Sequence, residues 1–227
     1  MKLLYPDLVD VAIASSGPVL AKADFFEYLE TVSDDFEKYG TPGCFDKIGK
    51  IFKKRYEEML KTTTGIKLLK EEEQICVGTD MNKLQNQQIF LIEKIGIFKT
   101  EAQYGDLNSL KKQCELIVRS SLFFSLKDEE IDLWNERVDK GVRKTNYMYG
   151  GLRPNVKNVV FVNGEMDPWH RLSILKDISY DAPAIVVPFS SHCKALLFDQ
   201  PGDPEELKEA RRDIKYLVKK WIGAGEL

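Results

Sequence analysis

Three short apolar runs mark the two ends of the chain. They cover residues 9–15 (VDVAIAS), 159–162 (VVFV) and 184–187 (AIVV), and turn-forming Pro, Asn, Gly or Ser residues lie beside them. Short, continuous apolar runs rich in β-branched side chains are typical of strands in a parallel sheet that is covered on both faces. The pattern therefore predicts three buried strands, one near the N-terminus and two in the last third of the chain.

The C-terminal region predicts one amphipathic helix. Asp203 is a candidate N-cap, Pro204 fits the first helical position and Glu206 follows at N3. Gly223 can end the helix. A single apolar stripe at helical spacing indicates packing on a core. Its members are Leu207, Ala210, Ile214, Leu217, Val218 and Trp221.

The middle of the chain, residues 23–149, is rich in Lys and Glu and lacks strand-like runs. Residues 45–60 and 107–122 show helical periodicity, whereas the polar stretch 68–73 is interpreted as a loop or a helix start. The order strand, helical insert, strand, strand, helix predicts one α/β domain. Its core would comprise residues 1–22 and 150–227, and residues 23–149 would form a helical cap insertion.

The composition is that of a folded globular protein. The 227 residues include 43% hydrophobic and 30% charged side chains, which excludes a mostly disordered chain. The net charge of −3 does not favour a nucleic-acid partner, and no run of 18 apolar residues predicts a membrane span. The first ten residues lack the pattern of a signal peptide, so the chain by itself is interpreted as cytosolic.

Asp167 and His192 are the candidate catalytic pair. Asp167 follows the predicted strand at 159–162, and His192 follows the strand at 184–187. Catalytic groups of α/β proteins lie just beyond the ends of such strands, and the order Asp, then His matches an α/β-hydrolase. The alternative interpretation is that Asp167 caps a turn and His192 is a hydrogen-bonded loop residue.

A nucleophile for this pair is missing from the sequence. An α/β-hydrolase needs a serine in a G-x-S-x-G turn that precedes the acid and the base. Ser16 is the nearest candidate, but Ala14 and Pro18 occupy the places of the glycines. Ser190 and Ser191 follow Asp167 and are therefore in the wrong order.

Other chemistries for this region are disfavoured. A Cys193–His192 dyad is unfavourable because neighbouring side chains in an extended chain point to opposite sides. A zinc site from Asp167, His170, His192 and Cys193 lacks the usual ligand spacing. His170 is interpreted as a helix-start or pocket-lining residue rather than a catalytic one, and Trp169 as a core residue or a pocket wall.

The four cysteines, Cys44, Cys76, Cys114 and Cys193, leave the redox compartment open. An even number permits three pairings in an oxidising compartment, and the same residues would be buried thiols in the cytosol. The residues themselves do not decide between these alternatives.

Several strings together resemble the S28 serine peptidases. Residues 5–9 (YPDLV) and 14–19 (ASSGPV) resemble the segment that follows the family's catalytic serine. Residues 145–151 (TNYMYGG) and 158–170 (NVVFVNGEMDPWH) resemble its aspartate segment, and residues 191–193 (SHC) its histidine segment. This family includes the lysosomal Pro-X carboxypeptidases, dipeptidyl peptidase II and the thymus-specific serine protease.

The resemblance implies a partial α/β-hydrolase fold with a helical cap of the SKS type. It implies a serine-type exopeptidase, either a carboxypeptidase or a dipeptidyl peptidase, that uses no cofactor and cleaves peptides with proline near a terminus. Asp167 would be the triad acid and His192 the triad base, and Tyr149, Trp169 and His170 would belong to the substrate pocket. It further implies a lysosomal or secreted family member, a homodimer and a Cys44–Cys114 disulfide.

The sequence departs from the family pattern in two places. The G-x-S-x-G segment would lie about a dozen residues before Tyr5, hence before Met1, and residues 115–133 lack the family's W-x-Y-Q-T-C-like motif. We therefore expect the chain to be the C-terminal portion of an S28 peptidase and to be inactive by itself. A non-catalytic pseudoenzyme or binding relative of the family, and an intact hydrolase that uses another nucleophile, are the alternatives.

Overall fold

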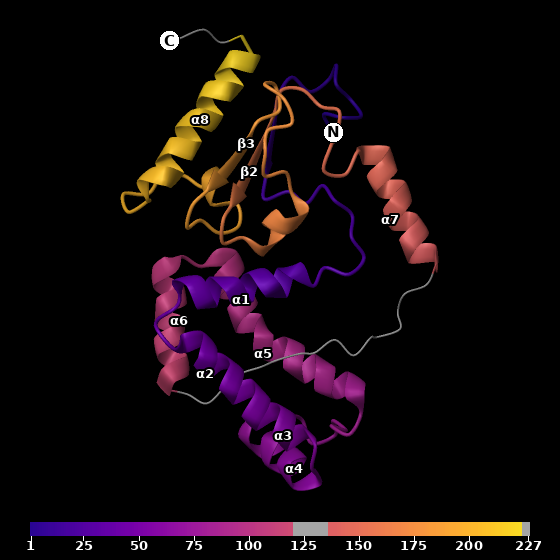
Figure 1. Cartoon of the computed structure of the whole chain (residues 1–227), viewed down its shortest axis with the longest axis vertical. Coiled ribbons are helices and arrows are strands. Elements are labelled where there is room, and N and C mark those ends of the chain that lie inside the picture. The colour runs from indigo at the N-terminus through magenta and orange to yellow at the C-terminus, as the bar shows by residue number, and fades with distance from the viewer. Residues whose placement is uncertain (120–135, 224–227) are drawn as a thin grey trace. The chain divides into compact units, whose positions relative to one another are not determined.

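The computed structural model describes residues 1–119 and 136–223 (Figure 1). The chain divides into two compact units. Met1–Thr31 and Ile131–Leu227 form one, here called the sheet unit, and Val32–Glu130 form the other, here called the helical unit.

The sheet unit contains a three-stranded parallel sheet with the order β1-β2-β3. Its strands are β1 (Ala12–Ser15), β2 (Val159–Gly164) and β3 (Ala184–Val187). The predicted mixed α/β architecture with a parallel sheet is confirmed. The first strand begins at Ala12, which pairs with Val159, rather than at residue 9 as predicted. The preceding residue of the partner strand, Asn158, has a positive φ of 55°, which is not strand geometry.

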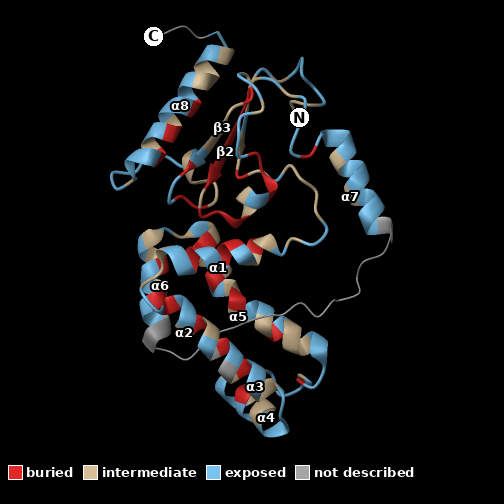
Figure 2. Ribbon diagram, viewed as in Figure 1, coloured by how far each residue is buried: buried red, intermediate tan, exposed pale blue. Residues whose placement is uncertain are grey.

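The central strand β2 is buried on both faces (Figure 2). Val160 and Val162 pack with Val187 against the apolar stripe of α8 (Glu205–Trp221). On the other face, Val159 and Phe161 pack among small and apolar side chains from the neighbouring strands and loops. Because both sets of alternating side chains are covered, the strand reads as a continuous apolar run.

The start of α8 differs from the sequence prediction. Pro204, not Asp203, is the N-cap residue, and no side chain caps the helix. The Asp203 carboxylate instead accepts hydrogen bonds from Arg211 Nη1 at 2.5 Å and from the Gln200 amide at 2.8 Å. The Arg211 hydrogen bond also holds the pKa of Asp203 below its ordinary value. The charged side chain of Arg211, eight residues further along, thus competes successfully for the carboxylate that was predicted to cap the helix.

The described part of the predicted insert is helical. The helices are α1 (Glu27–Tyr39), α2 (Cys44–Ile51), a π-helical turn at Phe52–Tyr56, α3 (Glu57–Leu60), α4 (Thr63–Glu72), α5 (Leu84–Tyr104), α6 (Leu107–Arg119) and α7 (Glu136–Tyr149). Residues 68–73, predicted as a loop or a helix start, lie at the end of α4, because Thr62 caps that helix earlier by accepting from the Gly65 amide. The last residues of the predicted helix 107–122, and most of the stretch 115–133, lie outside the described residues.

The helical unit is held by a covalent bond and by buried aromatic rings. Cys44 and Cys114 form a disulfide between α2 and α6. The Tyr56 ring contacts Phe52 and Phe90 with centroids 5.1 and 5.2 Å apart. The helix α7 belongs to the sheet unit, although its sequence falls within the predicted cap.

Candidate active site

Three loops meet at the carboxyl edge of the sheet. Because the strands are parallel, the residues that follow β1, β2 and β3 emerge at the same edge. Ser16 directly follows β1, Asp167 lies in the loop after β2, and His192 lies in the loop after β3. The topology thus brings together residues that are far apart in the sequence.

Asp167 and His192 form a hydrogen-bonded pair. His192 Nδ1 lies 2.9 Å from Asp167 Oδ2. The Asp167 side chain is fully buried, whereas 22% of the His192 side chain is exposed. The second carboxylate oxygen, Oδ1, accepts from the Trp169 amide at 3.1 Å. A buried carboxylate that occupies Nδ1 directs the proton chemistry of the imidazole to its other nitrogen, Nε2.

The backbone ties the aspartate loop to the histidine loop. The Glu165 amide donates to the Val187 carbonyl and the Met166 amide donates to the Ser190 carbonyl, both at 3.0 Å. This close approach requires glycine at position 164, where a Cβ atom would lie 2.2 Å from the Ser190 carbonyl oxygen. The Asn-Gly string at the end of β2 therefore has a steric cause.

Ser16 supports the histidine loop. Its side chain is buried, and its Oγ accepts from the Cys193 amide at 2.9 Å. The Cys193 thiol points to the Ser15 carbonyl at 3.6 Å, while His192 is bonded to Asp167, so the two neighbouring side chains have different partners. The sequence identified Ser16 only as an incomplete elbow. Its position at the end of a predicted strand placed it at the same sheet edge as Asp167 and His192, but did not indicate its partner, the Cys193 amide.

His170 lies in the 3-10 helix Pro168–Leu172, which Asp167 caps. Its Nδ1 atom is buried and has no hydrogen-bond partner among the described residues. Burial lowers the pKa of His170, and the positive charge of Arg171 lowers it further. This histidine is therefore biased toward the neutral form.

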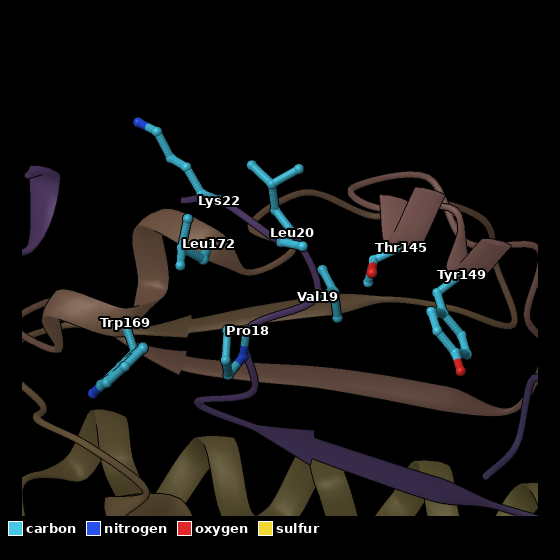
Figure 3. A pocket seen from close by; sticks show the side chains of 9 residues that line it. Pro18, Val19, Leu20, Lys22, Thr145, Tyr149, Trp169 and Leu172 are labelled. Carbon is cyan, nitrogen blue, oxygen red and sulfur yellow. The ribbon is translucent and has the colours of Figure 1, made fainter. Parts of the chain in front are cut away.

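A mostly apolar pocket of about 510 Å³ lies in the sheet unit and is lined in part by Trp169, two residues after Asp167 (Figure 3). Trp169 and Tyr149 both line it, whereas His170 is not among its lining residues. The other lining residues are Pro18, Val19, Leu20, Ala21, Lys22, Thr145 and Leu172. Its volume is in the range of small-molecule sites. Trp169 is also packed against Phe25 and Tyr28, with centroids 5.5 and 5.7 Å away, so this wall of the pocket is fixed.

The described residues contain neither a candidate metal cluster nor a helix that could span a membrane. Residues 1–119 and 136–223 contain no group of three or more His, Cys, Asp or Glu side chains arranged to hold a metal ion. Within the same ranges, every helix is too short or too polar to span a membrane.

Comparison with known proteins identifies the family. The sequence profile of Serine carboxypeptidase S28 matches residues 1–122 and 130–214. The chain belongs to this S28 family. The predicted membership is therefore confirmed, and the family consists of serine peptidases.

Three individual relatives match shorter regions of the chain. The thymus-specific serine protease of Mus musculus is 34% identical over 112 residues, which cover 48% of this chain and 22% of the mouse protein. The human protein of the same name is 33% identical over 85 residues, or 37% of this chain and 16% of its own length. The lysosomal Pro-X carboxypeptidase of Bos taurus is 38% identical over 77 residues, which cover 33% of this chain and 15% of the bovine protein. The matches thus span less than a quarter of each relative.

Proposed function

We propose that this chain carries the acid and the base of a Ser-Asp-His triad in an S28 exopeptidase. Asp167 would be the acid and His192 the base. The observation that carries the proposal is the 2.9 Å contact between His192 Nδ1 and the fully buried Asp167 carboxylate at the carboxyl edge of a parallel sheet. The complete fold would be an α/β-hydrolase with an SKS-type helical cap.

The geometry suits general base and then general acid catalysis. With Nδ1–H donated to Asp167, the Nε2 lone pair of His192 takes the proton of the serine hydroxyl as its oxygen attacks the peptide carbonyl. The resulting imidazolium is stabilised by the Asp167 carboxylate, and Nε2–H then protonates the leaving amine. A water molecule hydrolyses the acyl-enzyme by the same two proton transfers. The Trp169 amide keeps Asp167 oriented throughout.

The nucleophile is not assigned to any of the 227 residues. The sequence contains no G-x-S-x-G segment, and the Oγ atom of Ser16 already accepts from the Cys193 amide. We therefore expect the chain by itself not to hydrolyse peptides. Which terminus of the substrate the complete enzyme trims is left open between a carboxypeptidase and a dipeptidyl peptidase.

The pocket supports peptide substrates with proline near a terminus. Trp169 is two residues from Asp167 and forms one wall, so the pocket begins next to the proposed catalytic pair. Its apolar lining and the aromatic face of Trp169 suit a proline ring. Tyr149 lines the same pocket, whereas His170 does not. Of the three residues predicted for the substrate pocket, the proposal therefore keeps Trp169 and Tyr149.

A lysosomal or secreted location is part of the proposal. The Cys44–Cys114 disulfide in the helical unit fits an oxidising compartment. Two relatives, from Bos taurus and Pongo abelii, are named lysosomal Pro-X carboxypeptidases.

A serine-directed fluorophosphonate probe tests the catalytic assignment. The 227-residue chain should not be labelled, and stoichiometric labelling would contradict the proposal. A longer protein that contains these residues and a G-x-S-x-G segment should be labelled and should cleave proline peptides. There, His192→Ala should lower turnover by about 10³-fold or more. The matched control is His170→Ala, which should retain turnover, and equal turnover in the two variants would remove His192 from its role.

A non-catalytic, peptide-binding relative is the second candidate. It is favoured by the missing elbow together with a pocket that is formed entirely by described residues. This candidate predicts that proline peptides bind to the chain although the fluorophosphonate does not label it. It would be preferred if the longer protein also failed to react.

A further inference from the structure

The segment 18–22 forms one long wall of the pocket although it has no regular secondary structure. Figure 3 shows it running between Trp169 and Leu172 on one side and Thr145 and Tyr149 of α7 on the other. An irregular segment keeps its place only if its backbone groups find partners. The position of this wall is therefore set by whatever binds residues 19–21.

One side of the segment is fixed by the 3-10 helix after β2. The amides of Val19 and Leu20 both donate to the Leu172 carbonyl, at 2.9 and 3.0 Å. These two bonds connect the wall to the element that also carries Trp169.

The other side is fixed by a single side chain of α7. Asn146 Oδ1 accepts from the Ala21 amide and Asn146 Nδ2 donates to the Ala21 carbonyl, both at 2.8 Å. The two residues are 125 positions apart in the sequence. Thr145 and Tyr149, which line the pocket, belong to the same helix, so one amide group links the two walls.

The chemistry of this link requires asparagine. The Ala21 backbone offers one donor, its N–H, and one acceptor, its carbonyl oxygen. A side-chain amide matches both, because it carries one acceptor oxygen and one donor nitrogen in the same plane. Aspartate would lack the donor and would place a carboxylate oxygen beside the Ala21 carbonyl. Glutamine is one methylene longer than the 2.8 Å contacts allow without moving the helix.

The two glycines after α7 form the turn next to Asn146. Gly150 has a φ of +87°, and its amide donates to the Asn146 carbonyl at 2.8 Å, which closes the helix. Gly151 has a φ of +50°, a conformation that favours glycine, and it lies in ordinary contact range of Asn146 Oδ1 and Leu20 Cδ1, each 3.6 Å from the position of an added Cβ atom. The string 145–151 (TNYMYGG) therefore supplies pocket-lining residues, a clamp and the turn behind it.

We infer that Asn146 is a positioning residue that holds the two walls of the pocket together through the Ala21 backbone. Its importance for substrate recognition rests on the proposed function of the pocket. Its structural effect does not, and this allows the two to be tested separately.

Amide hydrogen exchange on the 227-residue chain tests the clamp directly. Asn146→Ala should speed exchange of the Ala21 amide by about tenfold, the effect of one net hydrogen bond, whereas Asn146→Asp keeps an acceptor for that amide and should speed its exchange less. Val160 and Val162 of β2 should keep their protection. The matched control is Tyr147→Ala, on the same helix with 93% of the side chain exposed, which should leave Ala21 unchanged.

Unchanged exchange at Ala21 in Asn146→Ala would overturn the inference. An equal rise at Val160 and Val162 would overturn it too, because Asn146 would then stabilise the whole unit rather than position one wall.

Binding of the blocked dipeptide acetyl-Ala-Pro-amide, followed by chemical-shift titration, tests the consequence for recognition. Asn146→Ala should weaken binding by about fivefold to tenfold, and Tyr147→Ala should not. Equal affinity of the wild type and Asn146→Ala would overturn the inference. If the wild type does not bind the dipeptide, the proposed substrate pocket is wrong, while the exchange result still decides the role of Asn146.

Discussion

The sheet unit and the helical unit hold their chain segments together by different means. In the sheet unit, polar contacts join residues that are far apart in the sequence, such as Ser16 with Cys193 and Ala21 with Asn146. In the helical unit, the Cys44–Cys114 disulfide joins α2 to α6, and helices pack around buried aromatic rings. The proposed catalytic pair and the pocket both lie in the unit whose geometry depends on hydrogen bonds and close backbone contacts. Loss of one contact there should disturb the site, whereas loss of the disulfide should not.

The largest expected effect is in the helical unit. Replacing both Cys44 and Cys114 by serine removes a cross-link that spans 70 residues, which should lower the free energy of unfolding of that unit by about 4 kcal/mol. Hydrogen exchange in α2 and α6 measures the loss. The control is Cys76→Ser, since Cys76 is exposed and unpaired with any cysteine, and it should change stability by less than about 0.5 kcal/mol. An equal loss of protection in β2 would show that the two units are not independent.

The next effect should appear where β2 meets the histidine loop. Gly164→Ala places a Cβ atom 2.2 Å from the Ser190 carbonyl oxygen, so the strand end or the loop must move. We expect a loss of about 2–3 kcal/mol in thermal or urea unfolding, together with shifted NMR signals of His192. Gly141→Ala in α7, where the added Cβ meets nothing within 4 Å, should be neutral or stabilising by up to about 1 kcal/mol. Similar losses in both variants would argue against a specific close contact.

A smaller effect is expected from Ser16→Ala. The change leaves the half-buried Cys193 amide without its acceptor, which should cost about 1–2 kcal/mol. Exchange of the Cys193 amide should accelerate more than exchange of β2 amides. In a longer protein that contains these residues and a G-x-S-x-G segment, Ser16→Ala should lower turnover but not abolish it, because Ser16 supports the histidine loop and is not the proposed nucleophile. Complete loss of fluorophosphonate labelling with a normal fold would contradict that assignment.

The smallest effect concerns pH. Burial lowers the pKa of His170 below its ordinary value of 6.5, with a further contribution from the charge of Arg171, while the charges of Asp167 and Glu165 act in the opposite direction. The unfolded chain therefore binds a proton at a higher pH than the folded chain. The stabilisation from the neutral form is fully present above about pH 6.5 and is lost as the pH falls toward the lowered pKa. Between pH 7 and pH 5, His170→Gln should lose less thermal stability than the wild type, and identical slopes would exclude this contribution.

Much of the architecture could be predicted from local patterns. A strand that is buried on both faces gives a continuous apolar run, and a helix that is buried on one face gives an apolar stripe. The apolar runs of the parallel sheet and the stripe of α8 could therefore be identified from the sequence. The prediction that Asp203 caps α8 was wrong, because Arg211, eight residues away, binds the Asp203 carboxylate. Local capping rules do not include such a charged partner. The prediction of a loop or a helix start at residues 68–73 was wrong, because α4 already begins after its N-cap residue Thr62.

The candidate site shows the same division. The order of Asp167 and His192 after successive strands was enough to nominate them, because parallel strands end at one edge. The predicted pocket residues were only partly brought together: Trp169 and Tyr149 line one pocket, but His170, the next residue of the 3-10 helix, is not among its lining residues. Ser16 and Asn146 had no local signal for their partners.

The sequence by itself determined the strands, the C-terminal helix, the family and the two residues proposed for the triad. Each of these depends on patterns within about 15 residues or on short strings of specific residues. Tertiary structure alone decided that Ser16 supports the histidine loop, that Gly164 must lack a side chain and that Asn146 links the two pocket walls. These roles depend on contacts 2–4 Å long between segments separated by up to 177 residues, and no local pattern encodes which distant backbone group a side chain will meet.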